Sequence, residues 1–167
     1  VNEPQGIRRV WHIDPYMGKH GGFEYVPVGS DDRLNNTIQY RPVGTHSKTY
    51  DVAIMSYQTY RRQKITADLE NLGLYLAPVS GLWGGDRSDA LMKSLCMVHV
   101  HQNDNAPGIA SLRWAIAAAH HLPMITETVR DRGIFGYSCM VQSDYEHLAA
   151  FTAHMLKDRT QLQEYGE

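Results

Sequence analysis

Two adjacent arginines come soon after a short apolar run that ends at Met55. The pattern predicts a strand, a polar turn that contains Ser56, and a helix that starts near Thr59. Arg61 and Arg62 would then lie at a helix N-terminus, where backbone N–H groups and guanidinium groups both match the oxygens of a phosphate. The sequence therefore indicates an anion site at this turn. The alternative is that the two arginines lie on a solvated face of the helix.

The densest run of polar residues extends from His99 to Gly108 and precedes another expected helix. Gly108 would let a phosphate approach the backbone closely, and Asn103 and Asn105 can donate to sugar or phosphate oxygens. The run matches neither a G-x-G-x-x-G nor a Walker-type loop, so the motif alone does not identify a nucleotide site.

Two histidines in this run, His99 and His101, lie two positions apart on an expected strand and would share one face. That spacing is compatible with a metal pair. No third ligand is indicated, because the candidates are close only in sequence: Asp104, His120, His121 and Glu127. We therefore expect no divalent metal, and we expect His101 to hydrogen-bond the loop or a ligand.

Arg113 interrupts an otherwise apolar expected helix. An unpaired buried guanidinium is costly, so Arg113 must face either a carboxylate or a ligand, and both interpretations stay open. Trp83 follows the second expected strand, as does Ser80, and its ring can either stack on a base or cover the end of the sheet. The sequence contains no nucleophilic serine elbow, no paired-carboxylate signature and no H-E-x-x-H motif.

The composition limits the class of protein. The chain has 167 residues, of which 43% are hydrophobic, and a formal net charge of -2. This length fits one domain with a real core, and the charge gives no field that would attract nucleic acid or an anionic membrane. The apolar stretches are shorter than the roughly 20 residues of a membrane-spanning helix, and no signal peptide is evident, so we expect a cytoplasmic protein. Cys96 and Cys139 are expected to be reduced core thiols, with a disulfide or a reactive thiol as the alternative.

Proline and glycine divide the chain into two parts. Residues 1–49 are dense in both, so we interpret them as a loop-rich lead-in or interdomain linker with one short strand, Phe23–Val28. Because the chain starts at Val1, we expect it to be a piece of a longer protein. Residues 50–167 alternate between short apolar runs and stretches of helical periodicity, which is typical of one α/β domain.

The apolar runs, the helix caps and the glycine and proline residues of this domain predict its elements. We expect strands at Asp51–Met55, Leu74–Val79, Leu95–His101, Met124–Thr126 and Cys139–Gln142. Helices are expected from about Thr59 to a stop at Gly73 with Leu72 on the buried face, from about Asp86, from about Gly108 to His121, and after a capping box of Ser143 and Glu146. The last ten residues are expected to fray. The pattern predicts a Rossmann-like three-layer α/β/α fold with a parallel sheet of about five strands, in which ligands bind beyond the carboxyl ends of the strands.

Three stretches resemble one known family. They are Tyr50–Ser56 with Arg61 and Arg62, Gly81–Gly84 with Asp86 and Arg87, and Leu112–Pro123 with Met124–Glu127. Together they are similar to the C-terminal, donor-binding domain of GT-B-type glycosyltransferases, in particular to spore-maturation and spore-coat-type proteins and their phage relatives. In addition, either Val26–Asp31 or Pro42–Gly44 resembles the segment that precedes this domain in the family. The resemblance implies a nucleotide-sugar donor, no permanently bound cofactor, and an acceptor held by an N-terminal domain or a partner chain.

The resemblance also implies roles for single residues. Arg61, Arg62 and the helix N-terminus at Gly108 would neutralise the diphosphate leaving group. The other donor contacts would come from Ser56, Ser80, Trp83, His101, Asn103, Asn105, Arg113 and Glu127. The chain departs from the family at Ile116, where many members carry a ribose-binding glutamate, and at His121, where a glycine is usual. Two alternatives stay open: a non-catalytic nucleotide or sugar-phosphate binding module, and a structural or interaction domain that kept only the fold.

Overall fold

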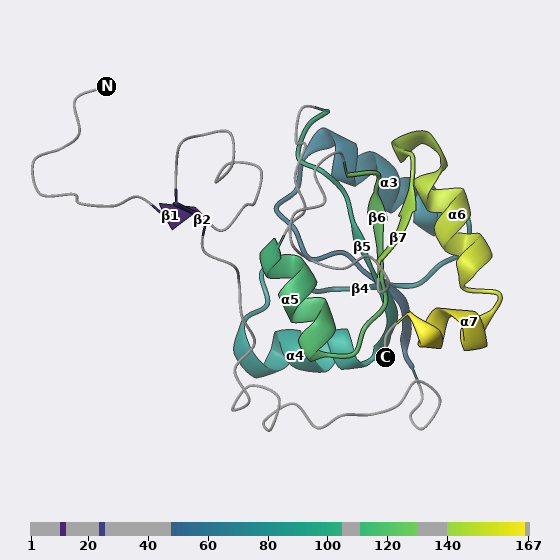
Figure 1. Cartoon of the computed structure of the whole chain (residues 1–167). Coiled ribbons are helices and arrows are strands. Elements are labelled where there is room, and N and C mark those ends of the chain that lie inside the picture. The colour runs from purple at the N-terminus through teal and green to yellow at the C-terminus, as the bar shows by residue number, and fades with distance from the viewer. Residues whose placement is uncertain (1–10, 13–23, 26–47, 105–110, 130–139, 166–167) are drawn as a thin grey trace, which may run out of the picture.

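The computed structural model describes residues 11–12, 24–25, 48–104, 111–129 and 140–165. Its main feature is a five-stranded parallel sheet between helices (Figure 1), and the strand order is β4-β3-β5-β6-β7. The strands are β3 (Tyr50–Ala53), β4 (Leu76–Ala77), β5 (Ser94–His99), β6 (Met124–Glu127) and β7 (Met140–Ser143). Each overlaps an expected strand, so the predicted parallel α/β fold is confirmed.

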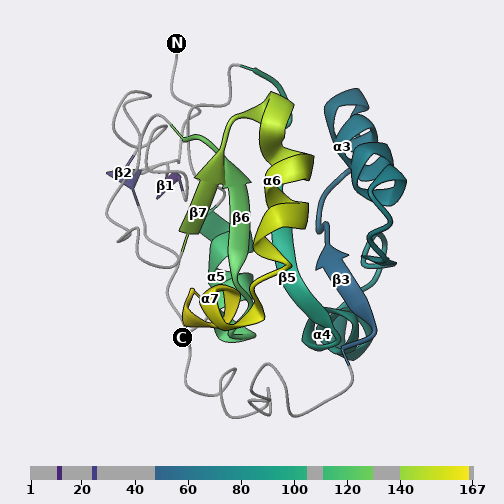
Figure 2. The same ribbon diagram turned by 90° about the vertical axis from the view of Figure 1, so that its right-hand side faces the viewer.

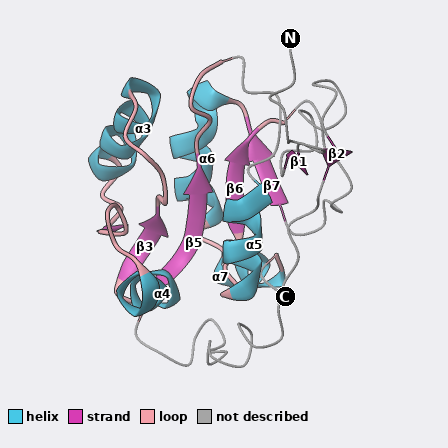
Figure 3. Cartoon of the chain, turned by 90° about the vertical axis from the view of Figure 1, so that its left-hand side faces the viewer, coloured by secondary structure: helices cyan, strands magenta, loops and turns pink. Residues whose placement is uncertain are grey.

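Helices cover both faces of this sheet. Figure 2 shows α6 (Leu148–Met155) and α7 (Arg159–Glu164) in front of one face, with α3 (Tyr60–Asn71) beside α6. Figure 3 shows α4 (Gly84–Met92) and α5 (Ser111–Ala119) in front of the opposite face. Two buried clusters correspond to these two sides. The α3/α6 cluster contains side chains of α3, α6 and α7, and the α4/α5 cluster contains side chains of α4 and α5. The arrangement is therefore the predicted three-layer α/β/α fold.

The central strand β5 explains how the two clusters share one sheet. All six of its residues are buried, and Cys96 and Val98 belong to the α3/α6 cluster whereas Met97 belongs to the α4/α5 cluster. A parallel strand covered on both faces is expected to be apolar along its whole length. His99 breaks this rule at the carboxyl end of β5, and alternation places its side chain on the same face as Met97.

The two ends of α3 form as the sequence predicts. Thr59 is the N-cap, and its side-chain oxygen accepts a hydrogen bond from the backbone N–H of Arg62. At the other end, Gly73 has a φ of 80°, and the backbone N–H of Leu74 donates to the carbonyl of Leu69, which is the bonding of a Schellman stop. The predicted burial of Leu72 is wrong, because it is the C-cap residue, where the chain turns away, and it is half exposed.

Two expectations about the C-terminal part are also wrong. Ser143 does not open a capping box, because it is the last residue of β7 and pairs with Glu127; Asp144 instead precedes a 3-10 turn, η1 (Tyr145–His147). Residues 159–164 do not fray but form α7. The side chain of Leu162 is completely buried in the α3/α6 cluster. One apolar residue on a polar segment is too weak a pattern to predict this helix.

Other boundaries differ by a few residues. β4 is shorter than the expected Leu74–Val79, because Pro78 follows it and cannot donate to a sheet ladder. α4 starts at Gly84, before the expected Asp86. A separate parallel pair joins β2 (Glu24–Tyr25), which lies within the expected strand Phe23–Val28, to β1 (Trp11–His12), which the sequence pattern does not indicate. Among the described residues, no helix has the length and apolar character to cross a membrane.

The strand order indicates which end of the sheet can bind a ligand. Counted along the chain from β3, the order is 2-1-3-4-5, so successive strands are added in opposite directions on the two sides of the β3–β5 pair. Doubly wound sheets of this order bind ligands beyond the carboxyl ends of those two strands. We call the segments that end or follow β3, β5 and β6 the carboxyl edge, which comprises residues 54–59, 99–104 and 126–127.

Candidate ligand-binding site

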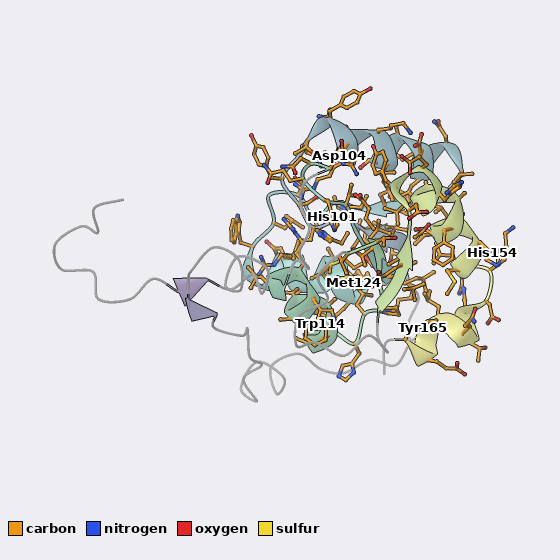
Figure 4. The ribbon with its side chains drawn as sticks, turned by 45° about the horizontal axis from the view of Figure 1, so that its top comes forward. His101, Asp104, Trp114, Met124, His154 and Tyr165 are labelled. Atoms are coloured by element: carbon orange, nitrogen blue, oxygen red, sulfur yellow. The ribbon has the colours of Figure 1, made fainter. Side chains whose placement is uncertain are left out.

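The carboxyl edge brings together side chains that are far apart in the sequence. The strand arrows in Figure 2 run toward the end of the sheet where α3 begins, and Figure 4 tilts that end toward the viewer, with His101 and Asp104 labelled beside α3. Arginines reach this edge from α3 and from α5. Both predicted arginine-bearing helices therefore contribute to the same site.

Arg62 is a buried link between the two loops of the edge. Its side chain is 3% exposed, its Nε donates to the carbonyl of Val100 at 3.0 Å, and its Nη1 donates to the carbonyl of Tyr57 at 2.6 Å. Burial lowers the pKa of Arg62, and the charge of Arg113 lowers it further. The alternative of a solvated helix face is therefore wrong for this residue, which holds the loop after β3 against the loop after β5.

Arg61 lies in a charged network on the same side of the sheet. Its Nη2 donates to Glu127 Oε2 at 2.6 Å, its Nη1 pairs with Asp104, and its guanidinium carbon lies 3.8 Å from the centroid of the Tyr145 ring. The hydroxyl of Tyr145 in turn donates to the carbonyl of Arg61 at 3.1 Å. Two carboxylates and an aromatic ring surround this guanidinium. Arg61 therefore links α3 to the segment after β5 and to the end of β6, and the two carboxylates neutralise its charge.

Glu127 connects this network to the β5 loop. Its Oε1 accepts the backbone N–H of His101 at 2.8 Å, while its Oε2 pairs with Arg61. Burial raises the pKa of Glu127, and the hydrogen bond from His101 and the charge of Arg61 oppose that shift. The sequence placed Glu127 among the donor contacts and the metal candidates, whereas its observed contacts are with the protein.

Arg113 is the arginine that reaches the carboxyl edge from α5. Its Nε donates to the carbonyl of Met55 at 2.8 Å, which brings the first turn of α5 to the end of β3. Burial lowers the pKa of Arg113. No ion pair between residues that the structure describes includes Arg113. Of the two interpretations left open by the sequence, the carboxylate partner is absent from this part of the chain, and the ligand contact stays a prediction.

The two histidines lie at the centre of the edge. The ring centroids of His99 and His101 are 5.4 Å apart, and both side chains are buried. Burial and the charges of Arg113 and Arg62 lower the pKa of His99 well below its usual range, and burial with Arg61 and Arg62 lowers the pKa of His101. Both shifts favour the neutral form of the two rings. In the described ranges, no group of three or more His, Cys, Asp or Glu side chains is arranged to hold a metal ion.

Unsatisfied polar atoms concentrate at this edge. Six buried side-chain nitrogen or oxygen atoms have no hydrogen-bond partner among the residues that the structure describes. Five of them come from residues on the edge or at the start of α3: Ser56 Oγ, Arg61 Nε, His99 Nδ1, His101 Nε2 and Thr126 Oγ1. The sixth, Thr66 Oγ1, lies within α3. Buried polar atoms in proteins are normally paired, so a concentration of unpaired ones indicates a place that water or a ligand fills.

The remaining predicted contacts are exposed to solvent or lie outside the described ranges. Trp83 is 78% exposed and precedes α4, with the guanidinium of Arg87 located 5.6 Å from its ring centroid. The interpretation that Trp83 covers the end of the sheet is wrong, because the ring faces solvent; base stacking stays a prediction. Ser80 and Asn103 are exposed in the loops after β4 and β5. Asn105, Gly108 and Cys139 lie outside the described residues, whereas Cys96 is a buried free thiol, as expected.

Two site residues escaped the sequence analysis. Thr126 was treated only as a strand residue, and His99 only as half of a metal pair. Parallel pairing of β5 with β6 places them side by side, and register of this kind cannot be read from one strand alone. Comparisons with protein-family models, with curated proteins and with solved structures found no match to the chain. The geometry of the edge therefore provides the evidence about function.

Proposed function

We propose that this chain is the donor-binding domain of a glycosyltransferase and that it binds the diphosphate and sugar of a nucleotide-sugar at the carboxyl edge. The observation that carries the proposal is the concentration of unpaired buried polar atoms at the end of β3, β5 and β6. A polyhydroxylated, phosphate-bearing ligand supplies the acceptors and donors that these atoms lack. The similarity of three stretches of sequence to the GT-B donor domain supports the same assignment.

The charge at the edge suits a diphosphate. Arg61, Arg62 and Arg113 bring three guanidinium groups to the edge, whereas Glu127 and Asp104 bring two carboxylates that both pair with Arg61. At this edge, the positive charges that no carboxylate among the described residues neutralises are therefore those of Arg62 and Arg113. Arg113 lies in the first turn of α5. A helix N-terminus and a guanidinium together stabilise phosphate oxygens.

In a transfer reaction, negative charge grows on the departing diphosphate as the bond to the sugar breaks. Arg113 and the N-terminal N–H groups of α5 would stabilise that charge, because the hydrogen bond from Arg113 to the carbonyl of Met55 holds the first turn of α5 at the edge. Arg62 holds the loops after β3 and β5 in place through its two carbonyl bonds. The acceptor would come from an N-terminal domain or a partner chain.

A non-catalytic binding module is the second candidate function, and one observation favours it. Ile116 occupies the α5 position where many of the GT-B glycosyltransferases that the sequence resembles carry the ribose-binding glutamate. Its side chain is partly buried and packs against the α4/α5 cluster. Position 116 therefore contributes to the core in this chain and offers no carboxylate to a ribose.

Isothermal titration calorimetry with the full chain tests the proposal. The ligands form a matched series: inorganic phosphate, nucleosides, nucleoside diphosphates and the corresponding nucleotide-sugars. We expect one site that binds a nucleoside diphosphate and its nucleotide-sugar and that binds the nucleoside and phosphate much more weakly. If no member of the series binds, the proposal is wrong. Binding without hydrolysis or transfer, even when an acceptor domain is supplied, would favour the non-catalytic module.

A further inference from the structure

Two of the unpaired atoms belong to neighbouring residues of the sheet. His99 and Thr126 are register partners in the parallel pair of β5 and β6. Alternation places both side chains on the face that carries Met97 and Met124, which pack in the α4/α5 cluster. Neighbouring strands are about 4.8 Å apart, so the two side chains are close enough for one small group to bond to both.

Both side chains are deeply buried and incompletely bonded. His99 is 4% exposed and Thr126 is 1% exposed, and neither His99 Nδ1 nor Thr126 Oγ1 has a hydrogen-bond partner among the described residues. Hydrogen-bonding atoms at such depth are costly when they stay unpaired. The unpaired hydroxyl of Thr126 therefore lowers the stability of the folded chain. Valine has nearly the same shape and would avoid this cost.

The chemistry of the pair differs from that of its surroundings. Arg113 and Arg62 lie close enough to disfavour a proton on His99, and His101 adds to this effect. A neutral imidazole offers one donor and one acceptor, and a threonine hydroxyl can also do both. A pair that both donates and accepts, without net charge, matches an uncharged hydroxyl group of a ligand. The diphosphate, which only accepts, is matched by the guanidinium of Arg113.

We infer that His99 and Thr126 form a hydrogen-bonding subsite for a sugar hydroxyl of the bound nucleotide-sugar. This inference rests on the proposed function and extends it, because it assigns the neutral part of the ligand to the β5–β6 pair and the charged part to Arg113. The hydroxyl belongs either to the ribose or to the transferred sugar, and the ligand series separates the two sources.

The test combines two substitutions with two matched controls in the full chain. Thr126→Val removes the hydroxyl and keeps the shape, and His99→Phe keeps a ring without nitrogen atoms. Thr66→Val removes another unpaired buried hydroxyl, away from the edge, and His154→Phe changes an exposed histidine on α6 (Figure 4). Circular dichroism and thermal melting confirm that each variant is folded before calorimetry.

We expect each edge substitution to weaken binding by about tenfold, the effect of one lost hydrogen bond, and each control to leave affinity unchanged. A ribose hydroxyl predicts equal losses for the nucleoside diphosphate and its nucleotide-sugar. A hydroxyl of the transferred sugar predicts a loss for the nucleotide-sugar alone. If the wild-type chain binds these ligands and both edge variants bind them equally well, the subsite is wrong and the proposed function stands. If the wild-type chain binds none of them, both are wrong.

Discussion

The unpaired hydroxyl of Thr126 leads to an unusual prediction about stability without a ligand. Thr126 and Thr152 are both buried threonines, but the hydroxyl of Thr152 donates to the carbonyl of Leu148 at 2.8 Å, whereas that of Thr126 has no partner among the described residues. Replacement of each by valine removes only the hydroxyl. The same chemical change should therefore have opposite effects at the two positions.

The magnitudes follow from the contacts. An unsatisfied buried hydroxyl costs about 1–3 kcal/mol, so we expect Thr126→Val to raise the free energy of unfolding by at least about 1 kcal/mol. A satisfied hydrogen bond contributes about 1 kcal/mol, so Thr152→Val should lower the free energy of unfolding by that amount. The two variants should thus differ by about 2 kcal/mol, or roughly 1 M in the urea midpoint.

Equilibrium urea unfolding of the full chain at pH 7, followed by circular dichroism, measures this difference. Equal m-values for both variants would show that the change lies in the folded state. A loss of stability in Thr126→Val as large as that in Thr152→Val would refute the reasoning. The hydroxyl of Thr126 would then have a structural partner, and the unpaired atoms at the carboxyl edge would no longer indicate a ligand.

Three other features of the molecule can be tested separately. Leu162→Ala should lower the free energy of unfolding by about 2–4 kcal/mol, because Leu162 is completely buried, whereas Leu72→Ala, at a half-exposed position, should cost much less; equal urea midpoints would show that α7 does not dock. The lowered pKa of His99 means that the unfolded state binds its proton more readily, so the stability linked to His99 is complete above about pH 6.5 and falls as the pH drops below that value. His99→Phe should flatten the fall in urea midpoint between pH 7.5 and 5.5, and an unchanged slope would contradict this. Burial raises the pKa of the Cys96 thiol to about 12, so a Cys139→Ser chain should react with a disulfide reagent only after denaturation, and rapid labelling of the folded chain would be inconsistent with the observed burial.

The sequence predicts the fold well because the signals for it are local. Apolar runs, the Thr59 cap and the Gly73 stop each act within one element, and the strict alternation of elements leaves few other arrangements. The loops that carry the site were also predictable, since a doubly wound sheet binds ligands at the carboxyl ends of its strands.

The details of the site depend on contacts that the sequence does not encode locally. Arg62 is buried because a carbonyl 38 positions away accepts its Nε–H bond. His99 and Thr126 become neighbours only through the register of β5 with β6. Ser143 has the spacing of a capping box with Glu146, but it is the pairing of β7 with Glu127 that determines its conformation.

Arg113 provides the most direct test of the central claim that the carboxyl edge binds the diphosphate of a nucleoside diphosphate or its nucleotide-sugar. Arg113→Gln removes one of the three guanidinium charges at the edge, and Arg159→Gln makes the same change at an exposed position of α7. In a calorimetric titration with the nucleoside diphosphate that binds the wild-type chain, the account predicts that Arg113→Gln weakens binding by at least about tenfold, whereas Arg159→Gln has no effect. Equal affinities for all three proteins would contradict the account.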